Sequence, residues 1–158
     1  LGEYKEEVEN TARQRFCANP VIDNVMAVYG SQAHREGIET EFVITTDSDA
    51  GIGAVDMVAI LANLMENAIH GCQESGKEHT WIRVQMGMKA GKLLIVVENT
   101  CREEITFKDG LPNQPGFRHR KGIGISSIVR SVEKYGGDMD FRSENGRFIS
   151  RIIIGRQD

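Results

Sequence analysis

Three segments of the chain place apolar residues three and four positions apart, the spacing of one face of a helix. The first follows Asn19-Pro20, a favourable N-cap and first helical residue, and extends to Gly37. The second stops near Gly71, and the third runs from about Gly124 to Tyr135. The pattern therefore predicts three main helices. Their inward positions are Val21, Ile22, Val25, Met26 and Tyr29 in the first segment, Met57, Ile60, Leu61, Leu64 and Ala68 in the second, and Ile125, Ile128, Val129 and Val132 in the third.

Apolar and alternating runs outside these helices predict about five strands. Residues 39–46, 80–88 and 92–97 are three of them, and the last two flank Asn145-Gly146, a strong hairpin signal. Residues 102–121 hold the remaining prolines and predict a long loop. Elements in this order, without internal repeats, predict an α+β fold. We expect a two-layer α/β sandwich with three main helices on a mixed sheet of about five strands.

The length of the chain suits one domain. With 158 residues, 40% of them apolar, the chain can bury one core and leaves little for a second. Residues 1–16 are rich in charge and have too few apolar side chains for a core face of their own. We therefore expect residues 1–18 to be the tail of an upstream helix or linker, and residues 19–158 to form the domain.

Charge and cysteine usage exclude several classes of function. Lys and Arg number 19 against 23 Asp and Glu, the formal net charge is -4, and the basic residues are spread along the chain, so nucleic acid is not favoured as a partner. Cys17, Cys72 and Cys101 are odd in number and irregular in spacing, which argues against a disulfide framework or a Cys/His metal site. We therefore expect a reducing compartment, the cytoplasm. No apolar run approaches the roughly 20 residues of a membrane span, although a chain that begins at Leu1 says nothing about its parent protein.

Asn63, Glu66, Asn67 and His70 share one stripe of the second predicted helix, because they are spaced three and four residues apart. We expect this stripe to face away from the apolar face. A solvated polar surface is the ordinary explanation of such a stripe. The two asparagines argue for more, because Asn is a poor helix former and its carbonyl is a neutral oxygen ligand suited to Mg²⁺.

The sequence Lys121-Gly-Ile-Gly-Ile-Ser-Ser leads from the predicted loop into the third helix. Gly122 and Gly124 lack side chains at a place where the backbone amides of a helix N-terminus could approach phosphate. Taken alone, the glycines could equally do no more than start a helix after a loop. A Rossmann fingerprint requires an apolar strand directly before the glycines, and none is present here. The Walker A pattern is also absent.

Glu98-Asn99-Thr100 directly follows the apolar run 93–97. A polar residue at the end of a strand often only begins a turn. The amide of Asn99 can nevertheless accept a hydrogen bond from the amino group of adenine and donate one to the adjacent ring nitrogen. A polar helix stripe, an adenine reader after a strand, a loop and a glycine turn opening a helix form a more specific pattern together than any one of them alone.

In this order the motifs resemble those of GHKL kinases. Residues 63–69 resemble the N-box, and Gly122-Ile123-Gly124-Ile125 with Ser127-Ile128 resembles the G2 box. The resemblance covers residues 19–154 and implies the ATP-binding catalytic domain of a bacterial sensor histidine kinase, on the fold shared with gyrase, the heat-shock chaperone ATPase and MutL. Four shorter motifs are similar to the peptide-sensing and quorum-sensing branch of these kinases: Asn19-Pro-Val-Ile-Asp23, Glu98-Asn99-Thr100, Asp109-Gly-Leu-Pro112 and Tyr135-Gly-Gly137.

The resemblance implies a role for each matched position. Asn67 would be the Mg²⁺ ligand and Asn63 its catalytic companion near the phosphates, while Asn99 would replace the usual adenine-binding aspartate. ATP-hydrolysing relatives carry a water-activating glutamate at the position of Asn63, so a neutral amide favours phosphoryl transfer to another acceptor. Residues 101–121 would form the ATP lid. The implied nucleotide-binding positions are Asn63, Glu66, Asn67, His70, Asn99, Arg120, Lys121, Gly122, Ile123, Gly124 and Ile125.

The lid region departs from the branch at two places. Lys121 stands where a histidine usually precedes the first glycine, and residues 113–116 lack the usual threonine and lysine. Basic residues just before the glycines are candidates for neutralising phosphate charge. These candidates are Arg118, His119, Arg120 and Lys121.

The function implied by the resemblance is transfer of the γ-phosphoryl group of ATP to a histidine, with ATP and Mg²⁺ as cofactors. All four histidines of the chain lie within predicted elements of the catalytic domain, so we expect the acceptor on a dimerising helix upstream of Leu1. The resemblance also implies a membrane-anchored homodimer as the parent protein and a response regulator as its partner. Two alternatives stay open: a serine kinase or ATPase of the same fold acting on a protein, and a docking module with a degenerate nucleotide site.

Overall fold

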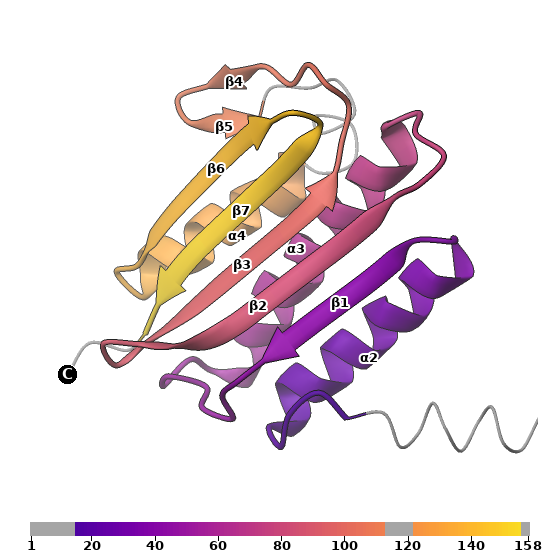
Figure 1. The fold of residues 1–158 in the computed structure, drawn as a ribbon. Coiled ribbons are helices and arrows are strands. Elements are labelled where there is room, and N and C mark those ends of the chain that lie inside the picture. Colours follow the sequence, from indigo (N-terminus) through magenta and orange to yellow (C-terminus); the bar gives the residue numbers. More distant parts are fainter. Residues whose placement is uncertain (1–14, 113–121, 156–158) are drawn as a thin grey trace, which may run out of the picture.

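The computed structural model describes residues 15–112 and 122–155, which form helices and strands in the predicted order (Figure 1). Residues 1–14, most of the predicted upstream tail, lie outside the described ranges. The helices are α2 (Pro20–Arg35), α3 (Ala54–Glu74) and α4 (Gly122–Lys134). The strands are β1 (Glu39–Ile44), β2 (Trp81–Lys89), β3 (Lys92–Thr100), β4 (Phe107–Lys108), β5 (Leu111–Pro112), β6 (Asp138–Glu144) and β7 (Arg147–Ile154).

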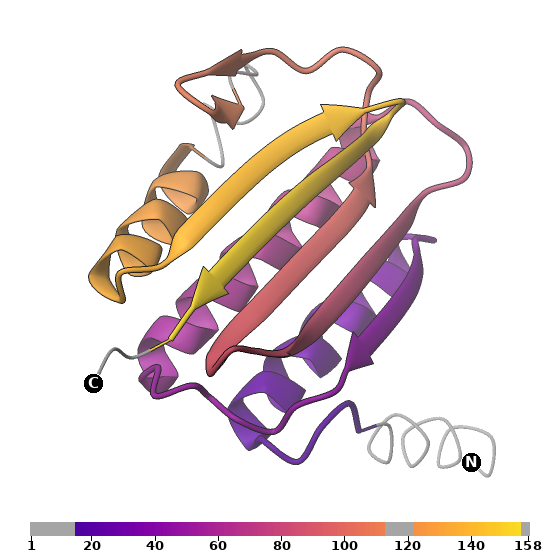
Figure 2. The same ribbon diagram turned by 60° about the vertical axis from the view of Figure 1, so that its left-hand side comes forward.

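The main sheet has five strands in the order β1-β2-β3-β7-β6. The pair β1 and β2 is parallel, since α3 connects them, and the other three pairs are antiparallel. Figure 2 shows β3 and β7 side by side in the middle of the sheet, although α4 and β6 lie between them in the sequence. The predicted fold class, three helices on a mixed five-stranded sheet, is confirmed.

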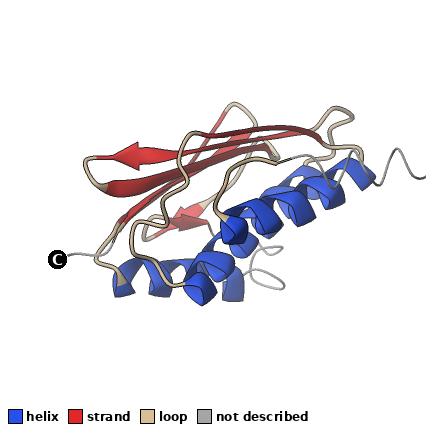
Figure 3. Cartoon of the chain, turned by 90° about the horizontal axis from the view of Figure 1, so that it is seen from below, coloured by secondary structure: helices blue, strands red, loops and turns tan. Residues whose placement is uncertain are grey.

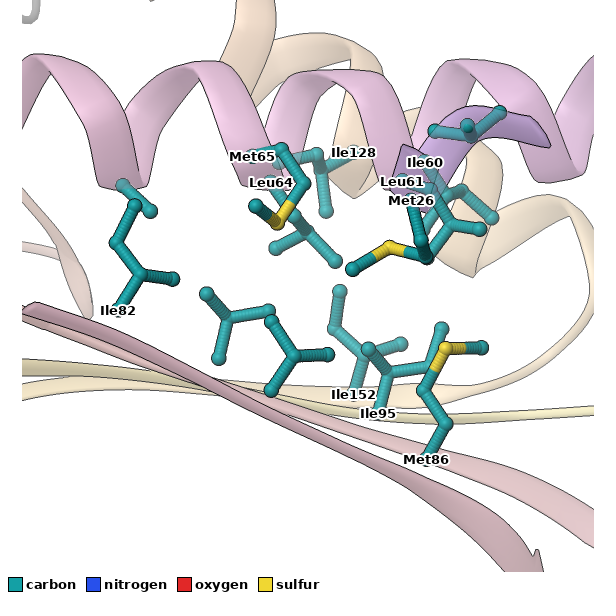
Figure 4. Packing of buried hydrophobic residues seen from close by; sticks show 14 of the residues in the cluster. Met26, Ile60, Leu61, Leu64, Met65, Ile82, Met86, Ile95, Ile128 and Ile152 are labelled. Carbon is teal, nitrogen blue, oxygen red and sulfur yellow. The ribbon is translucent and has the colours of Figure 1, made fainter. Parts of the chain in front are cut away.

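The helices form a single layer against one face of the main sheet (Figure 3). Because alternate strand residues point to opposite faces, one set of side chains meets the helices. Ile95 of β3 and its neighbour Ile152 of β7 belong to this set and are completely buried. Figure 4 shows them opposite Leu61, Leu64 and other residues of α3. Each fully buried aliphatic side chain of this kind stabilises the fold by about 1.5–3 kcal/mol, so this contact fixes α3 on the sheet.

The start of α2 follows the predicted capping pattern. Asn19 Oδ1 accepts hydrogen bonds from the backbone amides of Val21 and Ile22 at 3.0 and 3.1 Å, and Pro20 occupies the first turn, where its missing amide costs nothing. The helix ends at Arg35, and Gly37 follows with φ +75°, a conformation that favours glycine. Both boundaries come from local chemistry, which is why they could be predicted.

Two aspartates hold the chain immediately before α2. The amide of Phe16 donates to Asp23 Oδ1 at 2.7 Å, and the amide of Ala18 donates to Asp47 Oδ1 at 2.8 Å. The ring of Phe16 also packs edge-on against Phe42 of β1, with ring centroids 5.3 Å apart. Residues 16–18 are therefore tied to α2, to the segment after β1 and to the edge of the sheet.

Several predicted boundaries are wrong in ways that concern the site. The second helix passes Gly71 and continues to Glu74. Strand β3 extends to Thr100, so Asn99 belongs to the strand instead of the turn after it. Part of the predicted loop forms the hairpin β4–β5, and α4 begins at Gly122, two residues before its predicted start. The predicted Asn145-Gly146 hairpin is confirmed, with positive φ at both residues.

Within the described ranges, none of the helices combines the length and apolar character needed to cross a lipid bilayer.

Candidate functional site

The polar stripe of α3 differs from its prediction in its burial. Asn67 and His70 are only 5% and 6% exposed, while Asn63 and Glu66 are half-buried. The expectation that the whole stripe faces away from the core is therefore wrong. Asn67 and His70 lie at the border between the apolar face of α3 and its polar side. Burying two polar side chains at this position is expensive unless each has a partner.

Asn67 carries the clearest sign of a binding role. Its carboxamide oxygen Oδ1 is buried and has no hydrogen-bond partner within the described part of the chain. Leaving a buried carbonyl unmatched costs about 1–3 kcal/mol, so such groups usually serve a purpose. A neutral amide oxygen is a suitable Mg²⁺ ligand, because Mg²⁺ takes few protein oxygens and completes its shell with phosphate and water. Asn67 thus fits the role implied by the resemblance.

Glu66 faces a different neighbour. The hydroxyl of Tyr29 on α2 donates to Glu66 Oε1 at 2.8 Å. Burial, together with the hydrogen bond and charge of Glu66, raises the pKa of Tyr29 to about 12. Glu66 therefore joins α3 to α2, although sequence reasoning placed it with the nucleotide-binding residues. Tyr29 itself was expected only as an apolar position of α2.

Asn63 and His70 make contacts within α3. Asn63 Nδ2 donates to the carbonyl of Ala59 at 2.8 Å, one turn earlier. This bond orients the amide and leaves Oδ1 as its available acceptor. His70 Nε2 lies 3.9 Å from the carboxylate of Glu74, one turn later. Asn63 and Asn67 are successive members of one face, so their amides can serve the same bound group.

Asn99 lies on the helix-facing side of β3, against α3. It is 2% exposed, and its Nδ2 donates to the carbonyl of Thr100 at 2.9 Å. A Cβ atom added to Gly71 would lie 2.5 Å from Asn99 Nδ2. Gly71 is one turn after Asn67 on the same helix. The structure therefore places the predicted adenine reader, on β3, against the turn of α3 that follows the predicted Mg²⁺ ligand.

The glycine motif opens α4 as predicted. Gly122, Ile123, Gly124 and Ile125 form its first turn, and Ile125 is buried. The first turn of a helix leaves backbone amides without internal partners, which makes it suited to anions. The two basic candidates Arg120 and Lys121, together with Arg118 and His119, fall in residues 113–121, outside the described ranges.

A network at the other end of α4 joins that helix to α3. The Tyr135 hydroxyl donates to Asp56 Oδ2, and Lys134 Nζ lies 2.9 Å from the same oxygen. The amide of Gly53 donates to the Tyr135 hydroxyl at 3.0 Å. These bonds, that of Tyr135 first, hold the pKa of Asp56 below its usual value. The network ties the C-terminal end of α4 to the start of α3.

Phe107 connects the hairpin β4–β5 to the site. Its ring stacks on Phe148 of β7, with centroids 6.2 Å apart and an interplanar angle of 2°. Phe148 is in turn the cross-strand neighbour of Asn99. An exposed aromatic residue in a loop gave no sequence signal for this contact, since its partner is distant in the chain. The first part of the predicted lid is thereby attached next to Asn99.

The described residues hold no group of three His, Cys, Asp or Glu side chains able to bind a metal ion. A metal in this part of the chain would need oxygen ligands from elsewhere, such as amides and phosphate. Sequence reasoning missed Gly71 as part of the site, and it named Thr100 within the motif Glu98-Asn99-Thr100 without giving it a role. Gly71 was interpreted as a helix end because glycine inside a helix costs about 1 kcal/mol. The same cost was the available signal that a glycine within the helix could have a packing role.

Comparison with known families identifies the class of the domain. A family model described as a GHKL domain matches residues 52–155, more than half of the 158 residues. The chain therefore belongs to the GHKL domain family. GHKL domains bind ATP, generally with Mg²⁺. A comparison with curated proteins finds no match.

Solved structures with this fold include catalytic domains of histidine kinases. The catalytic domain of histidine kinase ThkA (TM1359) superposes with a TM-score of 0.66 at 19% identity, over 90% of this chain and 96% of that one. Acinetobacter baumannii histidine kinase AdeS gives 0.66 at 16% identity, over 96% of this chain and 73% of that one. The mycobacterial sensor histidine kinase MprB gives 0.60 at 16% identity, over 87% and 95%. The chain thus has the fold of histidine kinase catalytic domains.

Proposed function

We propose that this chain is the ATP-binding catalytic domain of a two-component sensor histidine kinase of the peptide-sensing and quorum-sensing branch. It would donate the γ-phosphoryl group of ATP to a histidine on an upstream dimerisation helix. The observation that carries the proposal is the buried Oδ1 of Asn67, which has no hydrogen-bond partner among residues 15–112 and 122–155. It lies one helical turn from Gly71, where an added Cβ would meet Asn99. The proposal is supported by the GHKL family match together with the fold shared with histidine kinases.

The residues divide into three groups around the nucleotide. Asn67 would hold Mg²⁺ through Oδ1, with the half-buried Asn63 beside the phosphates. Asn99 would read the base from the sheet side of the site. The first turn of α4 would present backbone amides to the phosphates. Arg120 and Lys121 would add positive charge there.

In this reaction the chain would contribute the positioning of the nucleotide and the electrostatic stabilisation of its phosphates. Bound Mg²⁺ supplies neutralisation of phosphate charge. The chain's own residues orient the nucleotide: Asn99 at the base, Asn63 and Asn67 at the phosphates. Asn63 cannot take a proton from water, and its amide is already oriented by the Ala59 carbonyl. An arrangement without a base at this position favours an acceptor that is itself a nucleophile, as a histidine imidazole is.

The partners follow from this function. The parent protein would be a membrane-anchored homodimer whose upstream helix carries the acceptor histidine, with this domain in the cytoplasm and a response regulator downstream. A serine kinase or ATPase of the same fold is the second candidate, and a docking module with a degenerate site is the third. Asn67 Oδ1, which is buried without a partner in the part of the chain that the structure describes, favours a functional nucleotide site over the degenerate one.

The deciding experiment uses a longer form of the protein that includes the upstream helix, incubated with γ-labelled ATP and Mg²⁺. We expect a label on the protein that is lost in acid and stable in base, as phosphohistidine is. The Asn67→Ala form should acquire little label. A label stable in acid would instead indicate a serine kinase, while the absence of both label and ATP binding would favour the docking module.

A further inference from the structure

The space between α2 and the edge strand β1 is incompletely filled, although the two elements lie side by side at one edge of the sheet (Figure 1). Three of the α2 residues that line this space are small: Ala27, Gly30 and Ser31. Phe42 of β1 lies opposite Gly30, where an added Cβ atom would be 3.1 Å from its ring. A groove of about 490 Å³ remains between these four residues, and we call it the edge groove. Because protein interiors are otherwise close-packed, a space of this size can accept further side chains.

The two ends of the edge groove differ in character. Phe16 lines one end, with its ring centroid 5.3 Å from that of Phe42. The other end is lined by His34 and Arg35, which are exposed in the last turn of α2. Within residues 15–112 and 122–155 neither of these two side chains forms an ion pair. The end of a helix is equivalent to about half a negative charge, so it offsets the charge of Arg35 only in part.

The acidic residues next to this basic end have other neighbours. Glu36 accepts a hydrogen bond from Gln73 of α3. Glu39 and Glu41 lie on the face of β1 away from α2, because alternate residues of a strand point to opposite faces. Glu41 is 3.7 Å from Arg83 on that face. The edge groove therefore combines aromatic surface at one end with positive charge at the other.

We propose that the edge groove is the docking site of residues 1–14 of this same chain. These residues are joined to the groove through Arg15 and Phe16, and Phe16 is part of its wall. From Ala27 to Arg35 the groove extends roughly 12 Å, at a helical rise of about 1.5 Å per residue. Residues 1–14 reach about 20 Å at the same rise, and further when extended. Because a short tether gives an effective concentration on the order of millimolar, weak contacts suffice to fill the groove.

The composition of residues 1–14 matches both ends of the groove. Their formal charge is -2, from four glutamates against one lysine and one arginine, and it complements the charge of Arg35. Tyr4 and Val8 supply apolar surface for the aromatic end. The four glutamates are Glu3, Glu6, Glu7 and Glu9. The inference is independent of the nucleotide site, since none of the residues proposed to bind ATP lines the groove.

Hydrogen exchange of the full chain, followed by mass spectrometry, tests the docking. The quantity compared is the protection of residues 1–14, that is, their exchange rate relative to the intrinsic rate of the same sequence. Arg35→Glu replaces an attraction by a repulsion, so it should lower the protection roughly three- to tenfold. Arg130→Glu, at an exposed arginine of α4, is the matched control and should exchange like the wild type. Equal protection in the wild type and Arg35→Glu would overturn the inference.

Charge reversal on both sides identifies the contact. Replacing Glu6, Glu7 and Glu9 together by lysine should remove the protection in the wild-type background and restore it in the Arg35→Glu background. Loss in both backgrounds would overturn the pairing of these glutamates with the basic end of the groove.

Ser31→Phe tests the groove itself without changing any charge. The new ring occupies the space, so the protection of residues 1–14 should fall roughly as far as in Arg35→Glu, while circular dichroism shows the fold retained. Unchanged protection in this folded variant would place residues 1–14 elsewhere. Dilution of the wild type over a hundredfold should leave the protection constant, because the contact is within one chain. Protection that falls on dilution would assign the groove to a second copy and overturn the inference.

Discussion

Tyr29 of α2 donates its hydroxyl to the Glu66 carboxylate of α3 across 2.8 Å, immediately beside the residue proposed to hold Mg²⁺. Because the two side chains come from different helices, the bond fixes the rotation of α3 about its own axis. Glu66 and Asn67 are consecutive and lie about 100° apart around the helix. Glu66 can therefore face α2 while Asn67 faces the nucleotide side, and the first contact supports the second.

Tyr29→Phe should destabilise the domain by about 1.5 kcal/mol, because it removes a hydrogen bond to a charged, half-buried group. Urea unfolding followed by circular dichroism would measure the change. Val28→Ala is a suitable control, since Val28 is the next residue and is 61% exposed. If both variants unfolded at the same urea concentration as the wild type, the contact would contribute nothing to stability.

The same contact predicts a pH dependence at the alkaline end. The pKa of Tyr29 is raised to about 12 in the folded state, against an unfolded value near 10. The unfolded chain therefore loses this proton first as pH rises, and the stabilisation is complete below about pH 10 and disappears through pH 12. The stability of the wild type should fall more steeply over this range than that of Tyr29→Phe. Parallel curves would contradict the assignment.

Asn67→Ala should weaken Mg²⁺-dependent ATP binding roughly ten- to a hundredfold, through loss of a contact to a charged centre. The fold should be unaffected or slightly stabilised, because the variant removes a buried oxygen that has no partner within the described residues. Calorimetry with ATP, with and without Mg²⁺, measures both affinities. Asn24→Ala on the exposed side of α2 is the control. A variant that binds Mg²⁺-ATP like the wild type would remove Asn67 from the site.

Phe107→Ala should loosen the hairpin β4–β5. Its stack on Phe148 is of a kind that contributes about 0.5–1.5 kcal/mol, so the population of detached hairpin should rise about two- to tenfold. Limited trypsin digestion should then cut faster after Lys108, while Met88→Ala, which removes an exposed apolar side chain elsewhere, should not change the rate. Equal cleavage in both variants would show that the stack does not hold the hairpin.

The chain should bind ATP but turn it over very slowly. Asn63 is a neutral amide where hydrolytic relatives carry a base, a deficit typically of about 10²–10⁴ in rate. Glu66 accepts a hydrogen bond from Tyr29 at Oε1, which favours a role between the helices over that of a substitute base. A phosphate-release assay on this chain and on Glu66→Gln should show equally low rates. Robust hydrolysis that Glu66→Gln abolishes would place the protein on the hydrolytic side of the fold.

Features that depend on neighbouring residues could be predicted from the sequence. Asn19 caps α2 through amides two and three residues away, and Asn145-Gly146 makes its turn with its own backbone. The periodicity of α3 also located Asn63 and Asn67 on one face. The burial of Asn67 could not be predicted, because it depends on how far neighbouring elements cover the edge of the apolar face.

Gly71 shows why the rest of the site could not be predicted from the sequence. As a local signal, a glycine after an apolar face predicts the end of a helix. Its actual reason is the side chain of Asn99, which comes from another strand and becomes its neighbour only when β3 packs on α3. The pairing of Asn99 with Phe148, and hence the position of Phe107, depends likewise on the order of strands in the sheet.

The attachment of residues 16–18 has a mechanical consequence. Backbone amides on both sides of Cys17 are bonded to Asp23 and Asp47, and the ring of Phe16 is wedged against Phe42. These three contacts, two hydrogen bonds and one ring contact, restrict both bending and twisting of the chain at residues 16–18. A rotation of the chain ahead of Phe16 would therefore rotate α2 with it. The hydrogen bond from the Tyr29 hydroxyl to Glu66 would transmit this rotation to α3, one residue from Asn67.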